Sequence, residues 1–264
     1  MTFVACAPRV QPRSRPPNEA IPRTTVPALV GAEPSILSAQ HRDPTLADLE
    51  DGRTIAAIVY VVLSVEVDPA TLDPEFFVVA LDDGRRRRPA RVRLISGSES
   101  DENRTFSLAI ARPEGATQVH PLAVTITGPV FAEAGESLAE LAAEIDVIER
   151  PARLVLALRE AGQPGSCAGA AQAVRTFWSV PIAGGDAPDL AAISVTLDNG
   201  SIVHPQALDD HRLGVGALQE DDNVVEFCVA EQSPARRIAV PGSLFRDHFG
   251  IASAAGDSAI QRAP

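Results

Sequence analysis

Short runs of alternating apolar and polar residues fill most of the chain, and turn residues separate one run from the next. Alternation with a period of two places neighbouring side chains on opposite faces of a strand. We count seven such segments in the first half, at residues 35–41, 54–67, 75–82, 86–95, 104–111, 119–127 and 144–148. Seven short strands within roughly 110 residues predict two sheets packed face to face.

Three local features refine this pattern. The run Ile55–Leu63 is continuously apolar, but it is much shorter than the roughly 20 residues needed to cross a bilayer, so we interpret it as a buried strand. Asp83-Gly84 fits a two-residue hairpin turn, in which both residues need positive φ. The segment 136–145 departs from the strand pattern, because its apolar spacing fits a short helix or a loop.

The sequence of the folded part contains an internal repeat of two copies. LDDGRRRRP at residues 81–89 aligns with LDNGSIVHP at residues 197–205, an offset of 116 residues. Further pairs follow in the same order at offsets between 114 and 120 residues: Ser64 with Ser179, Asn103 with Asn223, Gly128 with Gly242, and Phe131 with Phe245. Two copies of this length predict tandem domains, because a solenoid has shorter and more numerous units.

We therefore divide the chain into four parts. Residues 1–34 form a tether rich in Pro and Arg, because its seven prolines remove backbone donors and fix φ. Residues 35–148 and 149–252 form two tandem β sandwiches, and residues 253–264 form a flexible tail. The predicted fold class is all-β, with a disordered segment ahead of the two sandwiches.

Three stretches of the first copy carry a family resemblance: SVEVDPATLDPEFFVVALDDG, NRTFSLAI and VTITGPVFAEAGESLA. They resemble the bacterial Ig-like domain that is common in S-layer and other surface proteins, although Glu66 stands where that family usually has proline. The resemblance covers residues 35–148 and extends more faintly over 149–250. It implies two tandem Ig-like sandwiches used as spacer or adhesive modules, and it implies no catalytic residues.

A cysteine near the start of the tether carries a second resemblance. The sequence FVAC at residues 3–6 resembles the end of a bacterial lipoprotein signal, in which the cysteine becomes lipid-modified. Only five residues precede Cys6, fewer than the apolar stretch that a secretory signal needs. Either the coding sequence starts further upstream and Cys6 carries the lipid, or Cys6 is a lone thiol in a flexible tail.

The number of cysteines favours the lipid-modified alternative. The chain has three cysteines, and lipid on Cys6 leaves Cys167 and Cys228 as a pair. A bridge would close a loop of about 60 residues and stabilise the second sandwich by about 4 kcal/mol in the chain-entropy picture. The alternative is Cys167 as a nucleophile in a G-x-C-x-G sequence, which needs a strand-to-helix elbow that the pattern does not predict.

Charge restricts the class of partner. The net charge of -12 argues against nucleic acid, whose binding depends on cationic contacts to phosphate. One basic run stands out, GRRRRPARVR at residues 84–93, and on a single strand it would place four arginines on one face: Arg85, Arg87, Arg91 and Arg93. We interpret that face as solvated and balanced by cross-strand acids. The functional alternative is a site for an anionic glycan, a lipid headgroup or an acidic protein surface.

The sequence offers little that fits a catalytic or metal site. His204, Asp209 and His211 match no zinc spacing, and Asp221–Asn223 lacks the glycine and ligand spacing of a calcium loop. We therefore predict no catalytic residues, no metal and no cofactor. The competing hypothesis is a loop-based enzyme or metal-dependent binding protein of the envelope that uses His204, Asp209 and His211.

The predicted function is that of a non-catalytic lipoprotein of the cell envelope that presents a structural, spacer or adhesive surface. Its expected partners are the membrane, through the lipid on Cys6, and an anionic glycan or an acidic protein surface, without nucleic acid. Its expected location is the outer membrane or the cell surface. A cytoplasmic protein with free thiols is the alternative.

Overall fold

The computed structural model describes residues 33–44, 55–95, 103–112, 119–146, 150–161, 167, 169–182, 189–209, 223–247 and 250–262. Within these ranges the regular elements are β-strands, apart from three short 3-10 turns at Pro69–Thr71, Pro74–Phe76 and Leu190–Ala192. The prediction of an all-β fold is therefore confirmed. In the same ranges, none of the helical segments has the length and apolar character that crossing a membrane requires.

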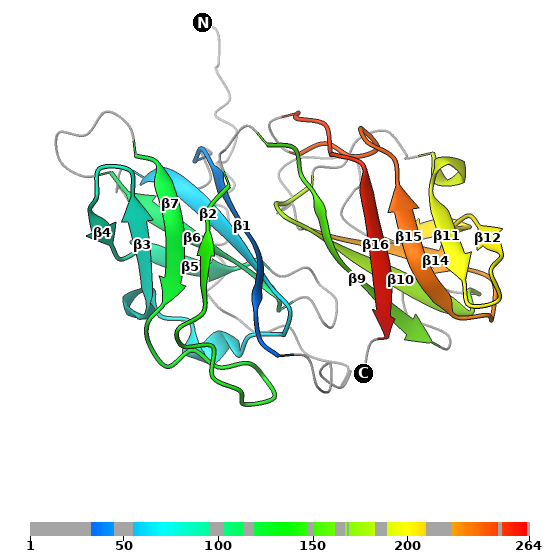
Figure 1. Cartoon of the computed structure of the whole chain (residues 1–264), viewed down its shortest axis with the longest axis horizontal. Helices are drawn as coiled ribbons and strands as arrows, with labels where there is room; N and C mark the ends of the chain where they lie inside the picture. Colours follow the sequence, from blue (N-terminus) through cyan, green and yellow to red (C-terminus); the bar gives the residue numbers. More distant parts are fainter. Residues whose placement is uncertain are drawn as a thin grey trace, which may run out of the picture.

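The first eight strands form two four-stranded sheets that pack face to face (Figure 1). One sheet has the order β1-β2-β6-β5, with β1 (Ile36–Arg42), β2 (Ile55–Leu63), β6 (Thr105–Ala111) and β5 (Arg91–Leu94). The other has the order β4-β3-β7-β8, with β4 (Arg86–Arg87), β3 (Phe77–Leu81), β7 (Pro121–Ile126) and β8 (Ala142–Glu144). Apolar side chains from both sheets, among them Val61, Phe77 and Val124, form the core between them.

The last eight strands pair in the same order as the first eight. The order β9-β10-β14-β13 repeats the first sheet, with β9 (Leu154–Ala161), β10 (Gln172–Trp178), β14 (Val224–Val229) and β13 (Ala207–Asp209). The order β12-β11-β15-β16 repeats the second, with β12 (Ile202–Val203), β11 (Ser194–Leu197), β15 (Ala235–Val240) and β16 (Gly256–Arg262). Here parallel pairing of β16 with β9 joins both sets into one continuous sheet.

Matching hydrogen bonds occur at matching places in the two sandwiches. Ser64 Oγ accepts from the Ser35 amide at 2.9 Å, and Ser179 Oγ accepts from the Arg153 amide at 3.0 Å. In each case the amide of the serine donates back to the carbonyl of its partner. The repeat in the sequence thus corresponds to a repeated strand order and to repeated contacts.

The expected pairing of Asn103 with Asn223 is shifted by one residue. At the end of β2, the Arg104 carbonyl accepts from the Leu63 amide at 2.8 Å. At the end of β10, the Asn223 carbonyl accepts from the Trp178 amide, also at 2.8 Å. Asn223 therefore corresponds to Arg104.

The expected pairing of Phe131 with Phe245 is shifted in the same way. The Val130 carbonyl accepts from Leu138, as the Phe245 carbonyl accepts from Ser253. Burial agrees with this assignment, because Val130 and Phe245 are buried whereas Phe131 is exposed. The two copies of the repeat therefore differ in spacing between their strands.

The expected strand at residues 86–95 is divided between the two sheets of the first sandwich. β4 pairs with β3, whereas β5 pairs with β6 of the opposite sheet. Pro89 lies buried between them, and the strand ends there because proline cannot donate to a ladder. The arginines therefore do not share one face: Arg85 directly precedes β4 and Arg87 lies on it, whereas Arg91 and Arg93 lie on β5.

One further expectation is wrong, and the helix alternative for residues 136–145 is excluded. Most of the expected flexible tail at residues 253–264 belongs to β16, which pairs with β15 and β9. Its pattern is faint because Ile260 is the one residue of β16 that is buried. The segment 136–145 contains no helix; it holds a turn and β8.

β2 is buried on both of its faces. Val59 and Val61 belong to the core of the first sandwich. Tyr60 and Val62 point the other way and pack against residues of the second sandwich, where they are 8% and 0% exposed. A strand covered on both faces needs a continuous apolar run, so the interpretation of Ile55–Leu63 as a buried strand is confirmed.

The predicted disulfide is present. Cys167 and Cys228 are bonded, with their Cα atoms 5.3 Å apart, and both are buried. Cys228 lies on β14 opposite Ala173 of β10, and Ala170 and Ala173 pack around the bridge. The bridge forms a cluster separate from the core between the two sheets, so it fastens the β9–β10 connection to β14.

Removing this bridge is expected to destabilise the second sandwich. The double variant Cys167→Ser/Cys228→Ser frees a loop whose ends are separated by 61 residues, which raises the chain entropy of the unfolded state. We expect the free energy of unfolding to fall by about 4 kcal/mol, measured by urea denaturation monitored by Trp178 fluorescence. Cys6→Ser is the matched control and should leave it unchanged. Equal effects of the two variants would contradict the assignment.

Candidate functional site

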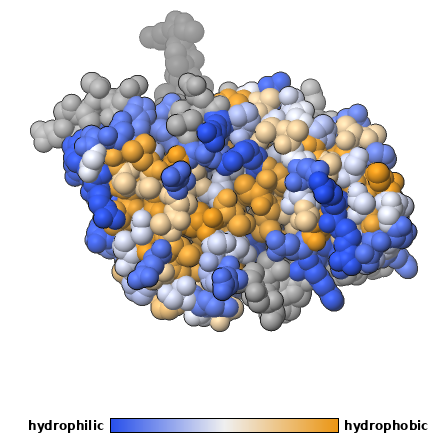
Figure 2. Space-filling view, viewed as in Figure 1, coloured by the Kyte–Doolittle hydropathy of each residue, from blue (hydrophilic) through white to orange (hydrophobic). Residues whose placement is uncertain are grey.

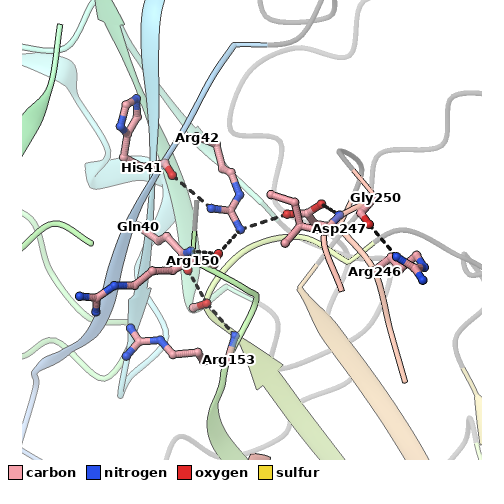
Figure 3. Close-up of polar contacts among 10 residues, drawn as sticks. Gln40, His41, Arg42, Arg150, Arg153, Arg246, Asp247 and Gly250 are labelled. Atoms are coloured by element: carbon pink, nitrogen blue, oxygen red, sulfur yellow. Dashed lines mark hydrogen bonds and ion pairs between the residues drawn. The ribbon is translucent and has the colours of Figure 1, made fainter. Parts of the chain in front are cut away.

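Polar side chains from both sandwiches meet where the two bodies touch. This junction cluster consists of Gln40, Arg42, Arg150, Ser179 and Asp247 (Figure 3). Gln40 and Arg42 come from the first sandwich, and Ser179 and Asp247 come from the second. Arg150 lies in the connection between them. The cluster therefore draws on residues far apart in the sequence.

β1 supplies Gln40 and Arg42. Ala39 of the same strand belongs to the first core, so alternation places Gln40 and Arg42 on the opposite face, toward the second sandwich. Both are 0% exposed. A strand that carries polar residues on its outer face normally faces water, so their burial requires partners from another part of the chain.

A tight turn after β15 presents Asp247. Its amide donates to the Ile251 carbonyl at 3.0 Å, and its Oδ1 accepts from the Ile251 amide at 2.9 Å. Gly250 completes the turn with φ of 78°, a conformation that favours glycine. The corresponding turn of the first sandwich has Ala132 and Gly135 in these places, so the carboxylate is specific to the second copy.

Arg42 and Asp247 form an ion pair that is closed to solvent. Arg42 Nη2 lies 3.0 Å from Asp247 Oδ2, and both side chains are 0% exposed. The same Nη2 donates to the Arg150 carbonyl at 2.8 Å. Burial lowers the pKa of Arg42 and the charge of Asp247 raises it, but a guanidinium keeps its proton in proteins. The pair thus holds two opposite charges inside the junction.

Gln40 connects the same elements through neutral hydrogen bonds. Its Nε2 donates to the Arg150 carbonyl at 2.8 Å, and its Oε1 accepts from Ser179 Oγ at 2.6 Å. Ser179 Oγ also accepts from the Arg153 amide, which fixes the start of the second sandwich. Gln40 therefore satisfies polar groups on both sides of the junction.

Apolar contacts flank the junction cluster. Val62 of β2 packs with residues of the second sandwich: Leu156, Leu158, Phe177 and Val224. The Arg104 guanidinium lies 5.8 Å from the centre of the Phe177 ring, within cation–π range. Burial of one large apolar side chain is worth about 1.5–3 kcal/mol, so this small group contributes substantially to holding the sandwiches together.

Asp146 also fixes the connection between the sandwiches, through both its side chain and its backbone. Its carboxylate accepts from Arg150 at 2.8 Å and also pairs with Arg153. Its backbone joins β1 in a parallel bridge, with bonds to His41 and Ala39 of 3.0 and 2.9 Å. The residues that enter and leave the connection are therefore held against the first sandwich.

His41 lies next to Arg42 on β1 and is buried. Its ring meets the His120 ring edge to face, with centroids 6.5 Å apart. Burial lowers its pKa to about 4; the charge of Asp43 opposes this shift, and His120 and Arg42 add to it. His41 is therefore neutral at pH 7.

A second buried ion pair lies beside the disulfide. Arg175 Nε donates to Glu226 Oε2 at 2.8 Å, and the Glu226 side chain is 1% exposed. Cys167 Sγ lies 3.5 Å from Glu226 Oε1. The bridge and this pair thus share one buried patch of β10 and β14.

The basic residues singled out from the sequence are not assembled into one site. Arg85 pairs with Asp83, which raises the pKa of Arg85 and lowers that of Asp83, and Arg88 pairs with Glu75 at 3.1 Å. Arg87 is exposed on β4. Arg91 and Arg93 are half-buried on β5, in the other sheet. Cys6 lies outside the described residues.

The residues of the competing metal hypothesis are only partly described. His204 Nδ1 contacts the Ile193 carbonyl at 2.6 Å, and Asp209 ends β13. His211 and Asp221–Asp222 lie outside the described residues. Among the residues that the structure describes, no group of three or more His, Cys, Asp or Glu side chains is placed to hold a metal ion.

Sequence reasoning missed the junction cluster. Arg42 and Asp247 are separated by 205 residues, and neither belongs to a recognisable motif. The available signal was the mixed character of SAQHR in β1, where polar residues fall on both faces of a strand. With zero exposure, the ion pair cannot contact a substrate from solvent, so its chemistry is suited to fixing the two sandwiches.

Comparison with known proteins does not identify a family for this chain. No family matches the sequence, and no curated protein matches it. The N-terminal part of the bacterial S-layer protein SbsC aligns at TM-score 0.31 and 12% identity, over 87% of this chain and 44% of that one. The S-layer protein rSbsC(31-844) aligns at 0.32 and 13%, over 88% and 26%. This chain spans less than half the length of either, and similarity this weak establishes no shared function.

Removing one charge of the buried pair is expected to destabilise the protein strongly. Asp247→Asn keeps an oxygen that can accept from the Ile251 amide, but it removes the negative charge that lies 3.0 Å from Arg42 Nη2 inside the junction. We expect the free energy of unfolding to fall by about 3–5 kcal/mol, measured by urea denaturation.

The matched control is Asp257→Asn, which breaks an ion pair with Arg237 on the surface. Its side chains are 47% and 63% exposed, so the expected loss is below about 1 kcal/mol. Losses of similar size in the two variants would contradict a special role for the Arg42–Asp247 pair.

His41 is expected to make the protein less stable in acid. Its pKa is about 4 in the folded protein against 6.5 for a free imidazole, so only the unfolded state binds the proton between these values. Stability should therefore fall as the pH drops from 6.5 to 4, by about 3 kcal/mol in total. His41→Gln should remove this slope in urea titrations at several pH values, and His120→Gln should keep most of it. A wild-type slope in His41→Gln would contradict the assignment.

Proposed function

We propose that this protein is a non-catalytic structural module of the cell envelope, in which two β sandwiches act as one rigid body. The observation that supports this most is the junction between them. Two sandwiches on a free connection would leave the outer face of β1-β2-β6-β5 in water, whereas Tyr60, Val62 and Arg42 are buried there. A module built in this way keeps its two ends at a fixed separation and orientation.

The disulfide supports a location outside the cytoplasm. Disulfides such as Cys167–Cys228 persist in oxidising compartments and are rare where glutathione keeps thiols reduced. The bridge and the neighbouring Arg175–Glu226 pair are buried together. Such a bridge serves stability rather than redox catalysis, because catalytic cysteines need access to their substrates.

The proposed attachment to the membrane is through lipid on Cys6. Three arginines follow it before the first acidic residue, at positions 9, 13 and 15. Basic residues near an anionic membrane surface add attraction to that of acyl chains. The proline-rich residues up to 34 would then hold the two sandwiches away from the membrane as a spacer.

The arginine-rich run has a structural role in this proposal. β4 and β5 are edge strands of their sheets, and charged residues on an edge oppose the addition of strands from other chains. Arg87 of β4 and Arg85 directly before it are exposed. In this proposal they are the residues that would bind an anionic glycan or an acidic protein surface. An enzyme remains the alternative class, with no described residue to favour it.

Protein isolated from its own cells is expected to carry one disulfide and a blocked cysteine. Intact-mass and peptide mass spectrometry without reduction should show Cys167 joined to Cys228, and an acyl-modified Cys6 at the mature N-terminus. Cys6→Ala should move the protein from the membrane fraction to the soluble fraction. Cys167→Ser, the matched control, should leave it in the membrane fraction. Free thiols on all three cysteines, with the protein in the cytosol, would contradict the proposal.

A further inference from the structure

The outer face of the β4-β3-β7-β8 sheet is unusually apolar. Strand alternation places Val78 and Ala80 of β3 on the face away from the core, together with Ala123 and Thr125 of β7, which lie opposite them. Ala142 of β8 lies opposite Thr125. Figure 2 shows apolar residues gathered over β3 and β7 in the view of Figure 1. We name these residues, with Arg86 and Glu144 at the two edges, the small-residue face.

The second sandwich provides an internal comparison, because its β12-β11-β15-β16 sheet has the same order. There the corresponding face also has alanines, at positions 239 and 259. It differs by carrying Ser194, Thr196 and an ion pair between Arg237 and Asp257, with Nε and Oδ1 2.5 Å apart. Charged and hydroxyl side chains are suited to water. The fold therefore does not require an apolar face at this place, and the first sandwich has one for another reason.

One row across the small-residue face has opposite charges at its ends. Arg86 of β4 lies opposite Ala80, Ala80 lies opposite Ala123, and Ala123 lies opposite Glu144 of β8. Adjacent strands are about 4.8 Å apart, so the two ends of this row are roughly 14 Å apart and cannot pair within one chain. Within the described part of the chain, neither Arg86 nor Glu144 has an ion pair.

We infer that a second copy of this chain docks on the small-residue face, related by a twofold axis that runs along the strands. Such an axis reverses the row, so each Arg86 lies over Glu144 of the other copy, and two ion pairs flank an apolar centre. Small side chains such as Ala80 and Ala123 let the two sheets approach closely. The face is self-complementary in both charge and shape.

Neither edge of the same sheet favours pairing with a strand of a second copy, so contact through the face is favoured. β4 carries exposed arginines, which oppose edge-to-edge pairing. At the other edge, the chain after β8 bridges to β1 at Gln40 and Asp146. Face-to-face contact requires no free edge, so it is compatible with both features.

The size of the face predicts a weak dimer. Four strands that average four residues cover roughly 250 Å² of sheet, below the roughly 800 Å² per partner of a standard interface. We therefore expect association only at high protein concentration, or where many copies lie side by side on one surface. This inference does not depend on the proposed function, because it concerns the chain in solution.

Charge reversal tests the inference directly. Sedimentation velocity of the full chain, from roughly micromolar to millimolar concentration, should show reversible dimers at the upper end. Arg86→Glu and Glu144→Arg should each weaken dimerisation at least roughly tenfold, because each places like charges opposite one another at both rims. The double variant Arg86→Glu/Glu144→Arg should restore it, since the pairs form again with their signs exchanged.

A second pair of variants tests the apolar centre. Arg237 occupies the position of the second sandwich that corresponds to Ala123 of the first. Ala123→Arg therefore introduces a side chain that this fold tolerates, and it should abolish dimerisation. Ala259→Arg places the same side chain on the corresponding face of the second sandwich, where Ala259 is exposed, and it should have no effect. Urea denaturation confirms that all variants fold. A chain that stays monomeric throughout, or dimers that survive the single charge reversals, would overturn the inference.

Discussion

Burial of both faces of β2 is the constraint on which the rest of the molecule depends. One face, with Val59 and Val61, closes the core of the first sandwich, and the other, with Tyr60 and Val62, is covered by the second. If the second sandwich moved away, this apolar face would enter water at a cost of about 1.5–3 kcal/mol for each large side chain. The duplicated units are therefore stable as a pair in one arrangement.

The polar part of the junction determines which arrangement that is. An apolar surface alone is compatible with many orientations, because the hydrophobic effect has no direction. The Arg42–Asp247 pair and the Gln40 hydrogen bonds have definite geometry, and leaving them unmade inside the junction would cost several kcal/mol. The attraction within a buried ion pair does little more than offset the free-energy cost of removing its two charges from water. The main contribution of these polar contacts is therefore to select one relative orientation of the sandwiches.

The sequence predicts the elements of this fold much better than their assembly. Strand alternation and the disulfide were accessible, because each depends on local pattern or on a small number of cysteines. The hairpin was predicted at the right place but with the wrong turn. The Leu81 amide donates to the Arg85 carbonyl across a loop of three residues, in which Gly84 has positive φ and Asp83 does not. β16 was missed because Ile260 is its one buried residue, so its pattern resembles that of a tail. The division of the arginine run at Pro89 was also missed, because alternation continues across it while the hydrogen-bonding partner changes.

The junction cluster could not be predicted from the repeat or from a recognised motif. Arg42 and Asp247 are ordinary surface residue types, and they become a buried pair only because two sheets meet. Ala132 at the corresponding turn of the first sandwich shows that duplication alone does not create the pair. Contacts between domains depend on surfaces, which the repeat in the sequence does not describe. The continuous apolar run of β2 was the single sign that both of its faces would be covered.

Hydrogen exchange in increasing urea, read by mass spectrometry, tests the central claim most directly. The strand sets β4-β3-β7-β8 and β12-β11-β15-β16 report separately on the two sandwiches. If the junction couples them into one cooperative unit, amides in β3 and β11 lose protection at the same urea concentration. Two separate midpoints, with one sandwich still protected while the other exchanges freely, would show that the junction does not hold the molecule together.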